Sequence, residues 1–493
     1  MKLTYGIKDK PNAGQLVIFA FQQLLAILAA TIVVPVIING NIAGLEKFGG
    51  VPGELSQAAA LFGAGVGTLV YLLFTKCKSP VFLGSSFAFL GSMTAAFAGA
   101  ATMKLGYLGL IIGAILAGLV YVVIALVVKV AGVGWINKLM PAVVIGPTVA
   151  IIGLSLAGNA VGDALSFAAD GHTMNLRGWI GLICALVTLF TVMICSVFGK
   201  KMAKLIPFII GIAAGYACAS IFTLIGMLTK NADMQIMDWS AFAGMKILSV
   251  PDFTFIKGFS EFKNLSGTYL AGVAVAYVPV AFVVFAEHIA DHKNLSSIIG
   301  KDLLEDPGLN NTLLGDGVGS MVGAFFGGCP NTTYGESIGC VAITGNASVV
   351  TILATSVLAI IASFIDPFVT VLSTIPSCVM GGVCIALYGF IAVSGLKMIQ
   401  KVDLDQNKNL FVVSVILIAG VGGMFLQIGK VYLTEIAAAL ILGIIANIIL
   451  SRKKDDAPVL EEAVEEPVEE IAEGTTEEAA EVIAEEAVEE VTE

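Results

Sequence analysis

Long apolar stretches separated by short polar connections run through most of the chain. A helix needs about 20 apolar residues to cross a bilayer, and fourteen stretches meet or approach that length. The predicted spans cover residues 14–38, 56–74, 81–99, 106–129, 139–157, 177–198, 204–228, 267–289, 309–327, 331–345, 347–365, 374–396, 409–427 and 431–451. The pattern therefore predicts an all-α polytopic membrane protein with fourteen transmembrane segments.

Segments three and ten are shorter and more polar than the others. They contain "SPVFLGSSFAFLGS" and "CPNTTYGESIGCVAITG", each with a Pro, then Gly and hydroxyl residues, then a run of small apolar residues. An unpaired backbone group in hydrocarbon costs several kcal/mol, so irregular polar sequence is tolerated there only where protein or water surrounds it. We therefore expect both segments to be broken, each a short extended strand followed by a half-helix.

The positions of these segments suggest an internal repeat. A long polar connection, about 230–266, divides the fourteen segments into seven plus seven, and an odd-numbered half must enter its second copy inverted. The broken segments are third in each half. Inverted-repeat transporters place their sites near the midplane on such discontinuous segments, where two helix N-termini direct positive dipole ends and free N–H groups at one point.

The distribution of Lys and Arg gives an orientation, because short cytoplasmic loops are enriched in both residues. The connections after spans two, four, six, eight and twelve hold Lys76, Lys78, Lys129, Lys138, Lys200, Lys201, Lys204, Lys293, Lys301, Lys397, Lys401 and Lys408. The opposite short connections hold fewer: Lys47, Lys104, Arg177 and Lys430. Both termini are therefore predicted to be cytoplasmic.

Composition agrees with a membrane protein, since 57% of the 493 residues are hydrophobic, 13% are charged and the mean hydropathy is +0.94. The net charge of −11 comes from the end of the chain, where residues 455–493 hold 17 acidic residues and no Lys or Arg; without those charges the remainder carries +6. Such an acidic, low-complexity tail is expected to be disordered and solvated. The eight cysteines show no metal-like spacing, and no metal or other cofactor is predicted.

Carboxylates within apolar segments mark the candidate chemistry, because ionisable residues in a membrane are costly and functional by default. The clearest are Glu287 and Asp291 at the end of span eight and Glu336 in span ten. Glu287 and Asp291 are four residues apart and share a helix face. Two such carboxylates repel each other and lose solvation, so at least one is expected to hold a proton near neutral pH, as a proton-coupled carrier requires.

Each of these residues also has a structural interpretation. Thr333 and Glu336 match the S/T-x-x-E capping box of a helix start. Asp291 and His292 could form a solvated span end, and His288 could be a hydrogen-bonded core histidine. Glu287 lies one turn deeper in the span, and a purely structural role is least convincing for this residue.

Several motifs together resemble the bacterial uracil permeases of the nucleobase/ascorbate (uracil-xanthine) transporter family: "SSFAF", "AEH", "DLLEDPGL", "PNTTYGE" and "LYG", in that order. The resemblance implies a seven-plus-seven inverted repeat that forms a core and a gate domain, an elevator-like motion, a homodimer and transport of a nucleobase with a proton. The implied parts are core 14–131 and 267–365, gate 139–228 and 374–451, and a cytoplasmic tail, 452–493. It implies no enzyme activity and no catalytic residue.

The resemblance also implies a binding site. Phe87 matches an aromatic residue that stacks near the base, Glu287 the carboxylate that binds it, and Tyr388 a tyrosine on the gate side. Tyr334 and Gly335 would belong to the extended segment beside the ligand, next to the carboxylate of Glu336. The implied substrate-contact positions are Phe87, Glu287, Tyr334, Gly335, Glu336 and Tyr388, and the proton-coupling candidates are Glu287, Asp291 and Glu336.

Three positions depart from the family pattern. Gln23 stands where His is frequent, Ser337 where Asn is normal, and Asp291 where the uracil permeases tend to have His and the purine carriers Asp. Glu336 and "NTTYGE" favour uracil, whereas Asp291 favours xanthine or uric acid; uracil is the stronger expectation. An anion exchanger of the same fold and a non-transporting receptor are the alternatives of another class, although Glu287 and Glu336 would repel an anion.

Overall fold

Helices make up most of the computed structural model, which describes residues 3–132, 141–168, 171–200, 202–428 and 431–451. The predicted acidic tail, 452–493, lies outside these residues. The α-helices are α1 (Ala13–Ala43), α2 (Gln57–Phe74), α3 (Leu90–Gly99), α4 (Met103–Ala131), α6 (Ala142–Ser155), α7 (Ala157–Ala164), α8 (Leu176–Phe198), α9 (Met202–Leu205), α10 (Pro207–Thr229), α11 (Thr254–Gly258), α12 (Gly267–Ile299), α13 (Leu309–Gly327), α14 (Gly335–Thr344), α15 (Val349–Ser363), α16 (Asp366–Ser373), α17 (Ser377–Ile399), α18 (Asn407–Val421) and α19 (Glu435–Leu450).

Shorter elements connect these helices. The short helical turns are η1 (Glu46–Phe48), η2 (Phe87–Phe89), η3 (Ala232–Met234), η4 (Ser240–Gly244), η5 (Phe259–Asn264) and η6 (Leu304–Gly308). The strands are β1 (Leu83–Ser85), β2 (Asn331–Thr333), β3 (Leu426–Ile428) and β4 (Val431–Leu433). They pair as β1 with β2 and β3 with β4, both antiparallel.

The helices confirm the membrane class that hydropathy predicted. Within the described residues, eight helices are long and apolar enough to cross a membrane, and four further apolar stretches of 10–17 residues are helical. Large apolar side chains on the outer faces of α8 and α10, among them Phe190, Phe198 and Leu228, are exposed. Such apolar surface is expected where a helix faces lipid.

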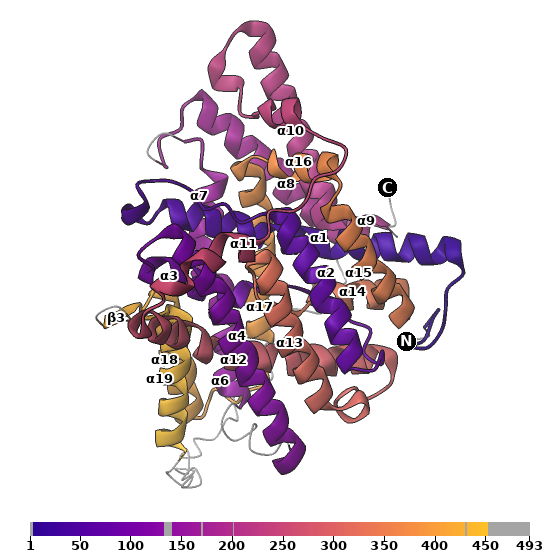
Figure 1. The fold of residues 1–493 in the computed structure, drawn as a ribbon, viewed down its shortest axis with the longest axis vertical. Helices are drawn as coiled ribbons and strands as arrows, with labels where there is room; N and C mark the ends of the chain where they lie inside the picture. The colour runs from indigo at the N-terminus through magenta and orange to yellow at the C-terminus, as the bar shows by residue number, and fades with distance from the viewer. Residues whose placement is uncertain (1–2, 133–140, 169–170, 201, 429–430, 452–493) are drawn as a thin grey trace, which may run out of the picture. The chain divides into compact units, whose positions relative to one another are not determined.

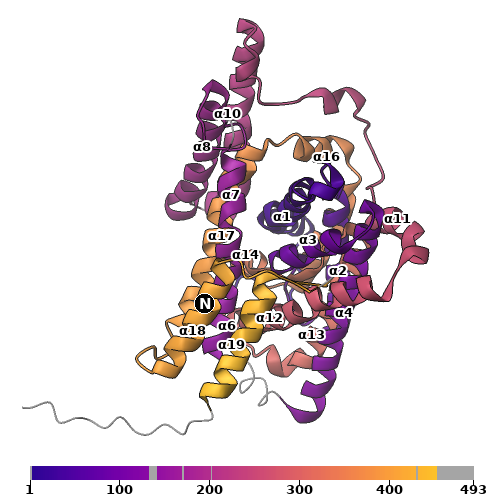
Figure 2. The same cartoon turned by 90° about the vertical axis from the view of Figure 1, so that its left-hand side faces the viewer.

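Two groups of helices can be followed in Figures 1 and 2. In one group α8 packs against α10 and α17, and α17 also packs along α6 and α7. In the other, α13 packs between α2 and α4, and α12 packs against α4. The second group surrounds the β1–β2 pair, because α2 contacts β1 and α13 contacts β2.

Glycines allow α2 and α13 to approach closely. A Cβ added to Gly63 would lie 2.4 Å from the Gly323 carbonyl oxygen, and one added to Gly67 would lie 2.7 Å from the Gly319 carbonyl oxygen. Small residues at helix contacts let backbones meet where no hydrophobic effect drives association. The close contact places the two helices directly behind the paired strands.

Two predicted boundaries were wrong. Helix α12 continues to Ile299, ten residues beyond the predicted end, because the polar residues that lower the hydropathy there include His292, which is buried and hydrogen-bonded. Helix α18 ends at Val421, before a glycine pair in which Gly423 adopts a positive φ of 66°. The apolar residues that follow form the β3–β4 hairpin instead of extending two helices.

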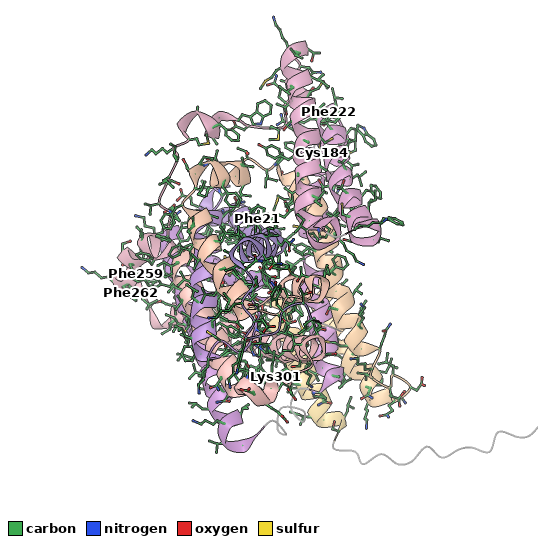
Figure 3. All side chains as sticks on the ribbon, turned by 90° about the vertical axis from the view of Figure 1, so that its right-hand side faces the viewer. Phe21, Cys184, Phe222, Phe259, Phe262 and Lys301 are labelled. Carbon is green, nitrogen blue, oxygen red and sulfur yellow. The ribbon has the colours of Figure 1, made fainter. Side chains whose placement is uncertain are left out.

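Phenylalanines anchor the long connection before α12. Phe253 and Phe255, beside and in α11, contact Phe325 and Phe326 of α13, with ring centroids 4.7–6.0 Å apart. Phe259 and Phe262 of η5, labelled in Figure 3, are partly exposed at the edge of this cluster. The connection is thereby packed onto the group of helices that surrounds the strand pair.

Candidate functional site

The two short strands satisfy each other's backbone. Leu83 pairs with Thr333, Gly84 with Thr332 and Ser85 with Asn331. Beyond the strands, the N–H of Ser86 donates to the Pro330 carbonyl oxygen at 2.8 Å and the N–H of Tyr334 donates to that of Phe82 at 3.2 Å. This pairing meets the requirement for internal hydrogen bonds in a membrane interior, and explains how the polar segments are accommodated.

Helix α14 begins directly after β2, and its start differs from the predicted capping box. Tyr334 takes the extended N-cap position, and its side chain makes no capping hydrogen bond. Thr333 lies one residue too early to cap, and its hydroxyl instead donates to Asp291 Oδ2 at 2.7 Å. The first-turn N–H groups, which have no partner inside a helix, are therefore not capped by Thr333, and the capping-box interpretation is wrong.

The predicted carboxylates lie on two elements that contact each other. Glu287 and Asp291 are in the interior of α12, not at a span end, and both are partly buried. Helix α12 contacts both β2 and α14, which carries Glu336 in its first turn. The Glu287 carboxylate is close enough to Asp291, Asp316 and Glu336 to interact electrostatically with all three. The structure thus gathers four acids around the strand pair.

Aromatic side chains from two elements meet beside the strands. The rings of Phe87, in η2, and Tyr388, in α17, are edge-to-face with centroids 5.9 Å apart. Both side chains are buried. The Tyr334 hydroxyl donates to the Ser85 carbonyl oxygen at 2.8 Å, while Gly335, at the start of α14, is exposed.

Two of the positions that depart from the family pattern contact each other. The Gln23 side-chain Nε2, on α1, donates to Ser337 Oγ at 2.5 Å. The same oxygen accepts from the backbone N–H of Phe82 at 3.0 Å. Ser337 therefore joins α1, α14 and the strip that leads into β1, and it directly follows Glu336.

Sequence reasoning missed a fourth acid. Asp316 is fully buried in α13, and its Oδ2 lies 2.7 Å from His288 Nδ1; His288 Nε2 lies 3.0 Å from Thr312 Oγ1. His288 has both ring nitrogens engaged, as a core histidine should. The location of Asp316 in the middle of predicted span nine was the available signal, since "LLGDGVGS" places an acid between apolar and small residues.

His292 contradicts the interpretation of a solvated span end. It is 1% exposed, and its Nδ1 lies 2.8 Å from the His288 carbonyl oxygen while its Nε2 lies 2.7 Å from the Tyr71 hydroxyl. Lys293 and Asn294, which follow His292, are exposed, so only one side of this part of α12 is internal. Over the part of the chain that the structure describes, no group of three or more His, Cys, Asp or Glu side chains is arranged to hold a metal ion.

Comparison with known proteins identifies the family. A family model described as the permease family matches residues 14–429. The chain belongs to this permease family. The permease is therefore a multi-pass membrane transport protein, and the resemblance that its motifs indicated is confirmed.

Curated relatives of the permease are similar over nearly their whole length. A uracil permease of Bacillus caldolyticus is 39% identical, with 92% of this chain and 96% of the relative covered. A uracil permease of Escherichia coli (strain K12) is 34% identical, with 89% and 92% covered.

Solved structures share the fold of the permease. The transmembrane domain of a cyanobacterium bicarbonate transporter, BicA, matches with a TM-score of 0.54 and 17% identity, covering 90% of the permease and 99% of that chain. The murine anion transporter Slc26a9 in the inward-facing state matches with a TM-score of 0.58 and 14% identity, covering 90% and 69%. At these identities the likeness concerns the fold alone.

Proposed function

We propose that the permease is a proton-coupled symporter that imports a nucleobase, uracil, across the cytoplasmic membrane by an elevator-type motion. One observation carries the proposal: the β1–β2 pair brings the first turn of α14, with Glu336, against α12, with Glu287, next to the buried ring of Phe87. The uracil permeases among its relatives support the choice of substrate.

The chemistry of the site fits a flat, neutral ring with alternating N–H donors and carbonyl acceptors. The carboxylates of Glu287 and Glu336 can accept from ring N–H groups, and first-turn N–H groups of α14, which neither Thr333 nor Tyr334 caps, can donate to a carbonyl oxygen. The Phe87 ring offers a stacking surface. Ser86 Oγ is buried without a hydrogen-bond partner among the described residues and could complete the hydrogen bonds of a ligand.

Asp291 is the residue that favoured xanthine or uric acid. In the structure it accepts a hydrogen bond from Thr333 of β2, so the chain itself provides a partner for it. This contact gives Asp291 a role in holding the strand pair, so the choice of uracil rests on Glu336 and on the uracil permeases among the relatives.

The grouped acids support proton coupling. Glu287, Asp291, Asp316 and Glu336 interact electrostatically, and within the described part of the chain His288 is the only basic side chain that pairs with any of them. Carboxylates that share a dry site cannot all be ionised at once, so such a cluster binds protons. Bringing a substrate N–H to Glu287 or Glu336 would then link substrate binding to proton binding.

The elevator motion would follow from the two groups of helices. We assign spans one to four and eight to eleven to the core domain (14–131 and 267–365) and the remaining spans to the gate domain (139–228 and 374–451), giving fourteen segments in an inverted seven-plus-seven repeat. The equivalent placement of β1 with α3 and β2 with α14 supports this repeat. The contact of Phe87 with Tyr388 would then join core to gate beside the substrate.

Uptake of radiolabelled uracil into proteoliposomes tests the proposal. Uptake above that of empty liposomes, accelerated by an inward proton gradient, is expected. Absence of uptake would exclude the carrier, and uptake indifferent to the gradient would exclude symport. Excess xanthine should leave uracil uptake unchanged; strong competition would reassign the substrate, while bicarbonate transport without uracil uptake would favour an anion exchanger.

A further inference from the structure

The two half-helices are held at the ends opposite the strand pair as well as beside it. Helix α3 follows η2, which carries Phe87, and ends at Gly99. Helix α14 carries Glu336 in its first turn and ends at Thr344. The last carbonyl groups of an α-helix have no partner within the helix. In both half-helices, the end of the helix contacts a segment that flanks α1.

Lys47, in η1 shortly after α1, binds the end of α3. Its Nζ donates to the carbonyl oxygens of Phe97 at 2.5 Å, Ala98 at 2.7 Å and Ala100 at 2.6 Å. An ammonium group has three N–H donors, so these contacts use all of them. The C-terminus of a helix carries a partial negative charge, which a cation at this position stabilises. Lys47 is therefore a charged cap on the half-helix that begins beside Phe87.

Side-chain contacts reinforce this cap. Lys47 Nζ lies 4.8 Å from the centroid of the Phe48 ring, and that ring meets the Phe97 ring edge-to-face with centroids 6.5 Å apart. Asn41, in the last turn of α1, donates from Nδ2 to Thr94 Oγ1 in the middle of α3 at 3.1 Å. Helix α3 is thus attached to α1 and η1 both at its end and at its middle.

The segment before α1 binds the end of α14 in a comparable way. The N–H groups of Thr4 and Tyr5 donate to the carbonyl oxygen of Gly345, directly after α14, at 2.8 and 3.2 Å. Within α1, the Gln23 side chain donates to Ser337 of α14. Helix α1, indigo in Figure 1, therefore contacts both half-helices and is flanked on each side by residues that hold one of them.

We propose that α1 and its flanking segments set the separation of the two half-helices, and that Lys47 is a positioning residue for the substrate site. Lys47 would act through α3, which is ten residues long and continuous with η2. Holding the end of so short a helix also holds the Phe87 ring that precedes its start. The proposal rests on the proposed function, in which Phe87 stacks on the nucleobase; Lys47 itself would not touch the substrate.

Lys47→Met removes the charge and all three donors but keeps an unbranched side chain. The end of α3 then loses its cap, and the Phe87 ring is held less firmly against the substrate. Uracil affinity should fall at least about fivefold, the lower end of what stacking of a base on an aromatic side chain contributes. Lys47→Arg should restore most of the lost affinity, because arginine can also bind the last carbonyls of a helix.

Binding of labelled uracil and thermal unfolding, both in detergent, separate positioning from stability. The affinity and the number of sites per chain are measured at a temperature at which every variant is folded. A residue that only stabilises the fold changes the melting temperature, whereas a positioning residue also changes the affinity of the folded protein.

The matched control is Lys301→Met. Lys301, labelled in Figure 3, pairs with Asp306 at 2.6 Å, and Lys78 pairs with the same carboxylate at 2.5 Å. These hydrogen bonds hold the pKa of Asp306 at about 2, so the carboxylate is ionised at neutral pH. Lys301→Met should therefore lower the melting temperature and leave uracil affinity unchanged.

A double variant identifies the route. In a Phe87→Ala background the ring is absent, so Lys47→Met should cause little further loss of affinity, whereas its effect on the melting temperature should persist. Asn41→Ala removes the second contact with α3 and should also weaken binding only when the Phe87 ring is present. It carries the test if Lys47→Met does not fold.

Four results would overturn the positioning role: wild-type affinity in Lys47→Met, a loss of binding sites without a change in affinity, an equal loss of affinity with and without the Phe87 ring, or the same loss in Lys301→Met. Failure of the proposed function would be visible in the wild-type protein, as an absence of uracil binding. Failure of the positioning role would be visible only in the variants.

Discussion

Gly84 is the position at which the strand pair leaves no room for a side chain. A Cβ there would lie 2.3 Å from Cε2 and Cζ of Tyr334, a distance that non-bonded carbon atoms do not reach. The substitution Gly84→Ala must therefore displace the Tyr334 ring. Tyr334 cannot yield easily, because its side chain is 4% exposed and its hydroxyl donates to the Ser85 carbonyl oxygen.

The expected cost has two parts. Forcing an extra methyl into a packed interior costs about 1–3 kcal/mol, and losing the Tyr334 hydrogen bond costs about 1 kcal/mol more. Gly84→Ala should thus destabilise the permease by about 2–4 kcal/mol. Because Tyr334 directly precedes Gly335 and Glu336, uracil binding should weaken as well.

Thermal unfolding in detergent and uracil binding measure both effects. The control is Gly158→Ala on α7, where an added Cβ meets no atom within 4 Å and the melting temperature should not fall. In a Tyr334→Ala background the obstacle is absent, so Gly84→Ala should cause little further loss. Wild-type melting and affinity in the single Gly84→Ala variant would refute the requirement for a side-chain-free position here.

Three further predictions follow from individual contacts. Glu287→Gln should abolish uracil binding, because an amide cannot replace the carboxylate as a charged acceptor; unchanged affinity in a binding assay would remove that residue from the site. Ser337→Ala should lower the unfolding free energy by about 1–3 kcal/mol, because two buried N–H donors lose their acceptor; Ser337→Thr, which keeps the hydroxyl, should lose less in the same melt. Asp306 has a lowered pKa, so its stabilisation is complete above its ordinary value of 3.8 and declines only as pH falls toward about 2. Lys301→Met should therefore reduce the melting temperature by the same amount at pH 5 and pH 8, and a strong difference between them would contradict the ion pair.

Hydropathy predicted most helix positions because lipid and packed protein both demand apolar side chains. Span nine was predicted at 309–327, and α13 covers those residues. The method failed where polar residues are internal: His292 is polar in sequence, yet it lies against Tyr71 and is as buried as the apolar core. A hydropathy scale assigns each residue the cost of an unpaired group, and only the fold determines which groups are paired.

The strand pair shows a different limit. Pro, Gly and hydroxyl residues predicted that segments three and ten would be irregular, but three-residue strands are too short for a periodicity that could set their register. The pairing of Gly84 with Thr332 also depends on the close approach of α2 and α13. These two helices are far apart in the sequence, and their glycines let them meet. Likewise, Thr333 matched a capping motif locally, while its actual partner, Asp291, is 42 residues distant.

Helix α12 explains how one element can serve both substrate and proton. Glu287 and Asp291 form one column with i, i+4 spacing, and His288 and His292 form a second column displaced by one residue. Successive residues of an α-helix point about 100° apart, so the columns face different neighbours: the first contacts β2 through Thr333, and the second contacts Asp316 and Tyr71. A shift of α12 would move both columns together. In the proposed symport this rigid connection makes a movement of Glu287 and Asp291 at one face and of the His288–Asp316 contact at the other depend on each other.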